Sequence, residues 1–196
     1  MNPEFHLPSP LFSEQPFDGR RRVVVDRVSP EIDGGRFPAK CVEGQSVKVE
    51  ADIFTDGADT VEAELLFRRR GEKEWSSVTM APLVNDLWTA AFTVGAPGVY
   101  EYTVRAWVDH FGTWQKGLRK KIDAGQEVGI DLKIGATIVE LGAARARGED
   151  AGTLHHHVGL LTVGDPGAAA EAALGDELTA AMRRCPDKSI ASTYEK

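Results

Sequence analysis

Cysteine is scarce in this sequence of 196 residues, which contains only Cys41 and Cys185. Their spacing matches neither a metal site nor a redox pair, so we expect two ordinary thiols in a reducing compartment. Long apolar runs are absent as well, since none approaches the ~20 residues that span a bilayer. The first twenty residues contain four prolines and no continuous apolar segment, which argues against a secretory signal peptide. Together these absences predict a cytoplasmic protein without a membrane segment.

Positive charge is in deficit. The 23 lysines and arginines are outnumbered by 30 aspartates and glutamates, which gives a net charge of −7 at neutral pH. This acidic balance argues against nucleic acid or an anionic membrane surface as the main partner. Apolar residues make up 42% of the chain, enough to bury one sizeable core. The length and composition therefore indicate one domain with an appendage rather than a multidomain enzyme.

The sequence motifs of common enzyme sites are also missing. Neither a GxSxG nucleophile turn nor a GxxxxGK[ST] or GxGxxG phosphate loop occurs. The three histidines at 155–157 would point about 100° apart on a helix, so we expect them on an exposed helix or loop, with a metal site as the weaker alternative. His110 follows Asp109 with no nucleophile motif nearby, and we interpret it as a residue of a turn at a strand end. The sequence thus predicts no catalytic, cofactor-binding or metal-ligating residue.

Alternating apolar and polar residues dominate the first two thirds of the chain. Residues 1–19 are proline-rich and aperiodic, as is typical of a tail. From residue 20 to about 125, short alternating segments are separated by turn residues, which predicts an immunoglobulin-like antiparallel β-sandwich. In the clearest strand, Val49, Ala51 and Ile53 share one face. The expected strands cover residues 23–28, 47–54, 61–67, 75–80, 87–94, 99–109 and 114–121.

A helical segment is expected from residue 126 to residue 196, where alanine, leucine, glutamate and arginine become frequent. Helical spacing relates Leu132, Ala136, Val139 and Ala143, while a short strand at 128–134 is the alternative. Pro166 can occupy the first position of a further helix. The apolar stripe of that helix ends near Cys185 and consists of Ala169, Ala172, Ala173, Leu178 and Met182. Short alanine-rich helices bury little surface alone, so we expect them to need a partner.

Trp107 is the aromatic residue that the alternating pattern does not accommodate. In the expected strand 99–109, Val104, Ala106 and Val108 share one face, which leaves Trp107 on the polar face. A large ring is costly to leave in water, and three interpretations follow. Another domain or subunit covers Trp107, both faces of the strand are core, or a platform for sugar rings forms with Trp114 and Trp88.

Long runs of the sequence resemble a known family. The runs are RVVVDRVSPEIDGGRFPAK at 22–40, EADIFTDG at 50–57, NDLWTAAFTVGAPGVYEYTVRAWVDHFGTWQKGLRKKIDAGQ at 85–126 and the terminal PDKSIASTYEK. They are similar to the amino-terminal region of bacterial maltosyltransferases that extend α-1,4-glucans from maltose 1-phosphate, relatives of the α-amylase family. The resemblance implies a sandwich N domain, a helical bundle inserted into it, a return of the chain to the sandwich and a following (β/α)₈ catalytic barrel. It also implies homodimers in which the N domain and the helical insert take part in assembly.

The same resemblance leaves this sequence without an active site. Retaining glycosyl transfer needs two carboxylates on a rigid scaffold, and in this family they would lie on the barrel, beyond Lys196. We therefore expect a non-catalytic assembly region without a cofactor, whose partners are the barrel and a second copy. The alternative is a freestanding glucan-binding module that contacts α-glucan through Trp88, Trp107 and Trp114.

An end at Lys196 has structural consequences if the helical insert is incomplete. The segment that returns to the sandwich would then be missing, and a strand edge of the sandwich would stay unpaired. Leu178 and Met182 would lie on a surface that a complete bundle covers. We expect such a chain to self-associate.

Overall fold

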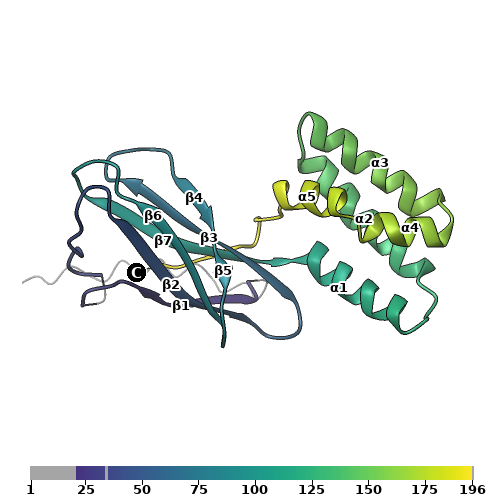
Figure 1. Ribbon diagram of the computed structural model, residues 1–196, viewed down its shortest axis with the longest axis horizontal. Coiled ribbons are helices and arrows are strands. Elements are labelled where there is room, and N and C mark those ends of the chain that lie inside the picture. Colours follow the sequence, from purple (N-terminus) through teal and green to yellow (C-terminus); the bar gives the residue numbers. More distant parts are fainter. Residues whose placement is uncertain (1–20, 34, 196) are drawn as a thin grey trace, which may run out of the picture.

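Two antiparallel sheets packed face to face form the larger part of the computed structural model, which describes residues 21–33 and 35–195 (Figure 1). The predicted tail at 1–19 lies outside the described residues. One sheet has the order β1, β2, β6, β5, formed by Val23–Ser29, Ser46–Thr55, Leu87–Thr93 and Ala81–Pro82. The other has the order β4, β3, β7, β8, formed by Ser76–Thr79, Thr60–Arg69, Tyr100–Asp109 and Ser192–Thr193.

The core between the sheets follows the alternation of the sequence. In β2, Val49, Ala51 and Ile53 are buried, while the residues between them are partly exposed. In β7, Val104, Ala106 and Val108 form the buried set on the facing sheet. Because successive strand residues point to opposite faces, burial of one face fixes the strand register. The strands predicted between residues 23 and 109 are confirmed.

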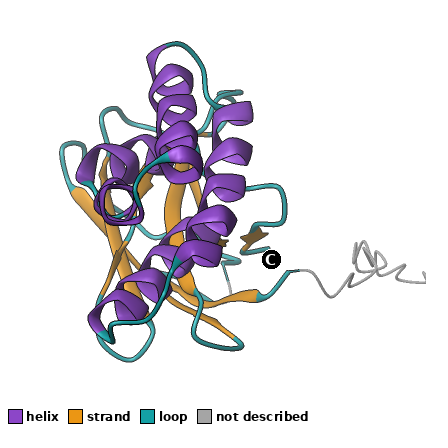
Figure 2. Cartoon of the chain, turned by 90° about the vertical axis from the view of Figure 1, so that its right-hand side faces the viewer, coloured by secondary structure: helices purple, strands orange, loops and turns teal. Residues whose placement is uncertain are grey.

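In the described part of the chain, five helices gather at one end of the sandwich (Figures 1 and 2). They are α1 at His110–Asp123, α2 at Gly129–Arg145, α3 at Glu149–Val163, α4 at Pro166–Ala173 and α5 at Asp176–Arg184. Their apolar faces enclose a core of their own, in which Leu118, Val139 and Leu154 are fully buried. The helix predicted from the spacing of Leu132 to Ala143 is confirmed, and the alternative strand at 128–134 is not formed.

The strand predicted at 114–121 is wrong, because these residues lie within α1. The Asp109 side chain accepts a hydrogen bond from the Gly112 backbone N–H at 3.0 Å and so caps the helix directly after β7. Phe111, Trp114 and Leu118 then recur at helical spacing and enter the helical core. The alternation of the preceding strand does not continue past Asp109, and the helical period replaces it.

The helix predicted from Pro166 is two helices, and its apolar stripe is not a surface. Pro166 does begin α4, but the helix is interrupted at Leu174 and Gly175, and α5 begins after them. Leu178 is 0% exposed and Met182 is 6% exposed, so the expectation that both are uncovered is wrong. Met182 lies against Gly142 of α2, where an added Cβ would stand 2.5 Å from the Met182 sulfur. This close contact between α2 and α5 covers Met182, so the described helices bury the apolar stripe themselves.

The chain returns to the sandwich after α5, contrary to the expectation of a missing return segment. β8 pairs antiparallel with β7, placing Ser192 opposite Ala106 and Thr193 opposite Arg105. The Tyr194 backbone N–H donates to the Val104 carbonyl at 2.9 Å. We call residues 185–195 the return segment. In Figure 1 it is the yellow stretch of chain that runs from α5 to the sandwich.

Candidate functional site

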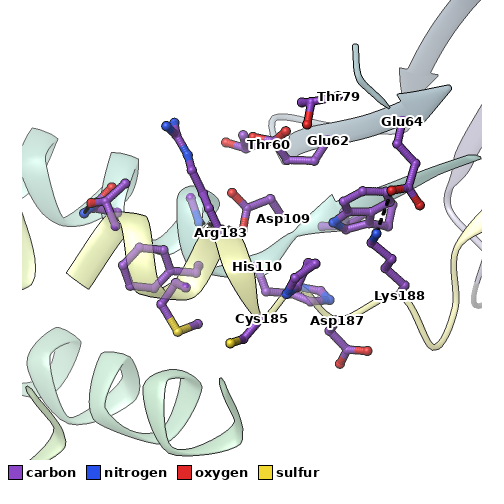
Figure 3. A pocket seen from close by; sticks show the side chains of 18 of the residues that line it. Thr60, Glu62, Glu64, Thr79, Asp109, His110, Arg183, Cys185, Asp187 and Lys188 are labelled. Carbon is purple, nitrogen blue, oxygen red and sulfur yellow. Dashed lines mark hydrogen bonds and ion pairs between the residues drawn. The ribbon is translucent and has the colours of Figure 1, made fainter. Parts of the chain in front are cut away.

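A cleft of about 950 Å³ separates the sandwich from the helices and is the candidate site (Figure 3). Its sandwich wall comes from β3, the residues of 79–82 and the end of β7. Its helical wall comes from α1, α2 and α5, and residues 185–188 of the return segment cross between the two walls. Clefts of this size between packed units are common places for ligands and partners.

A buried ionic cluster lies at the point where the return segment reaches the sandwich. Glu64 of β3 is 6% exposed, and its carboxylate accepts hydrogen bonds from Arg105 Nε and Lys188 Nζ, both at 2.7 Å. The Lys188 ammonium also lies 4.6 Å from the centre of the Trp107 ring. Glu64 and Arg105 face each other across the β3–β7 ladder, so strand register sets that pair. We call Glu64, Arg105, Trp107 and Lys188 the clamp; Figure 3 draws its Glu64–Lys188 contact as a dashed line.

A half-buried carboxyl group occupies the sandwich wall of the cleft. Burial raises the pKa of Glu62, the negative charge of Asp109 raises the same pKa further, and Arg183 of α5 opposes both effects. Figure 3 shows Glu62, Asp109 and Arg183 grouped in the cleft, with the hydroxyl-bearing side chains of Thr60 and Thr79 beside Glu62. The Asp109 side chain caps α1. Beside it, Thr113 Oγ1 accepts a hydrogen bond from the Thr60 backbone N–H at 2.8 Å, which ties α1 to β3.

Glu62→Gln is expected to raise the thermal midpoint of the chain at pH 7. A carboxyl group whose pKa is raised by folding favours the folded state below its unfolded pKa of about 4.3, and this contribution is lost as pH rises through the folded pKa. A glutamine stays neutral and keeps the contribution at neutral pH. Thermal melts at pH 7 and at about pH 4 should show a higher midpoint for the variant only at pH 7. The exposed Glu43→Gln is the control, and a midpoint lowered at pH 7 by Glu62→Gln would contradict the assignment.

The three tryptophans proposed as glucan or interface contacts are separate from one another. Trp88 is 8% exposed in the sandwich core, Trp107 is 8% exposed beneath Lys188, and Trp114 is 9% exposed in the helical core. Trp88 Nε1 donates to the Ile53 carbonyl at 3.2 Å and Trp114 Nε1 to the Asp131 carbonyl at 2.8 Å. The return segment of the same chain supplies the cover over Trp107. None of these rings presents an open face for a sugar in the described part of the chain.

The histidine run lies on α3, where its members have different surroundings. His155 Nδ1 is 3.5 Å from a Glu140 carboxylate oxygen at the surface. His157 is buried, contrary to the expected exposure, and its Nε2 is 3.3 Å from a Glu177 oxygen. Packing of α5 against α3 covers this ring. Among residues 21–33 and 35–195 no group of three or more histidine, cysteine, aspartate or glutamate side chains is placed to hold a metal ion.

The arginine run at 68–70 lies at the end of β3, an inner strand of its sheet. Glu101 of β7 accepts hydrogen bonds from Arg68 Nε and Arg70 Nε, each at 3.1 Å. These hydrogen bonds, from Arg70 first and Arg68 second, lower the pKa of Glu101. The Arg68 guanidinium also lies 4.3 Å from the centre of the Trp75 ring.

No described helix is both long and apolar enough to cross a membrane.

An exposed apolar stripe on α2 is a surface feature that the sequence interpretation missed. Ile130, Ile134 and Leu141 are 76%, 50% and 58% exposed. We call these three residues the α2 stripe. They recur at helical spacing on the side of α2 opposite to Leu132, Val139 and the rest of the core. The signal was present, because α2 carries apolar residues on two opposite sides, and a helix of this kind needs cover on both.

Comparisons with known proteins agree over nearly the whole chain. Residues 21–196 match the family described as "Alpha-1,4-glucan:maltose-1-phosphate maltosyltransferase, domain N/S". A protein of that enzyme name from Chlorobaculum tepidum is 68% identical over 196 residues, covering 100% of this chain and 29% of the relative. Relatives of the same name from Cereibacter sphaeroides and Salinibacter ruber are 38% and 37% identical over 180 residues. These alignments cover 89% of this chain but only 29% and 26% of the two relatives.

Proposed function

Because this chain belongs to the domain N/S family of the α-1,4-glucan:maltose-1-phosphate maltosyltransferases, we propose that it is the non-catalytic assembly part of such an enzyme. The enzyme would extend α-1,4-glucans from maltose 1-phosphate, with its catalytic carboxylates on a (β/α)₈ barrel outside these residues. The proposal includes an immunoglobulin-like sandwich N domain, a helical insert between β7 and β8, a homodimer and a cytoplasmic location. The small share of each relative that the chain covers supports a role as one part of a larger enzyme.

The α2 stripe is the observation that supports assembly. Large apolar side chains this exposed, in line on one helix, favour an interface over open solvent. A second copy fits the stripe, because a two-fold contact places the same patch on both subunits. In an antiparallel contact of two α2 helices, the exposed Lys133 of each copy lies near the exposed Glu140 of the other. The oppositely charged Lys133 and Glu140 side chains of the two copies would thus lie beside the apolar contact.

The glucan-binding alternative has weaker support. It depends on open faces of Trp88, Trp107 and Trp114, and all three rings are buried. Stacking on a sugar ring needs an accessible aromatic face. We therefore keep assembly as the proposed function.

Ile134→Asp is expected to weaken self-association of the chain. A charge in the centre of an apolar contact leaves an unpaired carboxylate when the two copies meet, and central apolar residues dominate such contacts. Sedimentation velocity over a concentration series should show dimers of the unsubstituted chain and a dissociation constant raised by about tenfold or more in the variant. Val42→Asp, which makes a similar change at a more exposed site in the loop before β2, is the control and should dimerise normally. Equal association of all three chains, or a monomer throughout, would contradict assembly through the α2 stripe.

A further inference from the structure

The helices are joined to the sandwich at two places. The first is the direct passage from β7 into α1 at Asp109 and His110. The second is the return segment, which leaves α5 at Cys185 and reaches β7 at Ser192. A helical body attached only at the first place could pivot about it, so the second place determines how firmly the two bodies are held together.

The return segment is anchored on both sides of the cleft within a few residues. On the helical side, Arg145 of α2 donates from Nη2 to the Cys185 carbonyl at 3.2 Å and lies 3.8 Å from an Asp187 carboxylate oxygen. The pKa of Asp187 is lowered by hydrogen bonds from Ser189 and, to a smaller extent, by Arg145. On the sandwich side, the next residue, Lys188, enters the clamp. The segment therefore bridges the cleft between Arg145 and Glu64.

The clamp holds the segment in place together with two hydrogen bonds farther along, from Ser192 Oγ to the Val23 carbonyl at 2.5 Å and from Thr103 Oγ1 to the Tyr194 carbonyl at 2.7 Å. A carboxylate as buried as that of Glu64 needs cationic partners, and Arg105 supplies only one of them. Lys188 adds the second and also contacts the Trp107 ring, where a partly desolvated ammonium is favourable. Beyond Lys188, β8 is only two residues long. Backbone pairing this short is weak without a side-chain anchor.

We infer that Lys188 is a clamp residue: its ammonium, held between the Glu64 carboxylate and the Trp107 ring, fixes the return segment on β7 and so holds the helices on the sandwich. This inference goes beyond the proposed assembly role, because it concerns one chain and needs no second copy. When the clamp opens, the return segment leaves β7 and Trp107 becomes exposed. Lys188 belongs to neither core, so the buried residues of both cores keep their contacts with one another, while Tyr194 of the return segment loses its packing on the sandwich core.

The test is amide hydrogen exchange by NMR on the 196-residue chain at a concentration where it is monomeric. Lys188→Met removes the charge and keeps an apolar stem over Trp107. The Tyr194 amide, which donates to the Val104 carbonyl, should exchange about tenfold faster in this variant. The Trp107 indole N–H should exchange faster as well. Amides in the centre of the β3–β7 ladder should keep their rates.

Two further variants separate a clamp from a general loss of stability. Lys188→Arg keeps the positive charge, and a guanidinium also binds the face of a Trp ring, so Tyr194 exchange should stay within about twofold of the unsubstituted chain. Lys73→Met makes the same chemical change at an exposed site in the β3–β4 turn and should have no effect. Unchanged Tyr194 exchange in Lys188→Met, or equal acceleration of every amide, would overturn the inference. Because exchange is measured on the monomer, a failed dimerisation test would leave this result unaffected.

Discussion

Val104→Asp is expected to unfold the sandwich. Val104 is fully buried in β7 and pairs with the equally buried Leu65 of β3. An aspartate there puts a carboxylate in the core without a partner, which costs several kcal/mol. Because a domain of this size is stable by only about 5–15 kcal/mol, such a loss removes most of its stability. Circular dichroism melts should show either no cooperative transition or a greatly lowered midpoint.

The control for this variant is Ala91→Asp, which places the same carboxylate on the exposed face of β6. A surface substitution of this kind should change the free energy of unfolding by about 0.5 kcal/mol or less. A cooperative melt of Val104→Asp at the temperature of the unsubstituted chain would show that the face assignment of β7 is wrong.

Gly135→Ala is expected to destabilise the helical part, although alanine is the better helix former. An added Cβ at Gly135 of α2 would stand 1.9 Å from the Trp114 ring of α1. Trp114 cannot easily move away, because its Nε1 donates to the Asp131 carbonyl and its ring is buried beside Phe111. Overpacking of this kind costs about 3 kcal/mol, which outweighs the helix-propensity gain of about 1 kcal/mol. Urea titration followed by Trp fluorescence measures the loss.

Gly159→Ala is the matched control within the helical part. Gly159 lies in the middle of α3, and a Cβ there would meet nothing within 4 Å. The substitution should therefore stabilise the chain by about 0.5–1 kcal/mol through helix propensity alone. If Gly135→Ala were as stable as Gly159→Ala, the close packing of α1 on α2 would be refuted.

The sandwich could be predicted from the sequence because β2 buries one face, and β7 buries one face along most of its length. Alternation in residues 47–53 and 100–108 therefore reports core and surface directly. The same alternation misled at the end of β7, where Asp109 caps a helix and Phe111, Trp114 and Leu118 change to helical spacing. The cap is a local signal that could have been used, since aspartate is a preferred residue at that position.

Packing between helices could not be predicted in the same way. Burial of Leu178 and Met182 depends on contacts with α2 and α3, including the space that Gly142 leaves for the Met182 sulfur. No short-range pattern encodes those contacts. The α2 stripe, in contrast, was visible as apolar residues on two opposite sides of one helix, and only the structure shows which of them face outwards.

The clamp has one predictable half. Glu64 and Arg105 have opposite charges on neighbouring strands, and the β3–β7 register places them face to face. Lys188 reaches them from a distant part of the sequence, so no spacing rule connects it to Glu64. For that reason the sequence could not show which residue covers Trp107. The polar face of β7 was identified correctly, and Lys188 of the return segment covers the Trp107 ring on that face.

The most direct test of the assignment to a maltosyltransferase is activity of a chimera. The 196 residues replace the aligned 29% of the Chlorobaculum tepidum relative, and maltosyl transfer from maltose 1-phosphate to a glucan acceptor is measured for the chimera and for the 196-residue chain alone. We expect turnover by the chimera near that of the unmodified relative and none by the chain alone. Turnover by a pure preparation of the chain alone, or a folded chimera without activity, would contradict it.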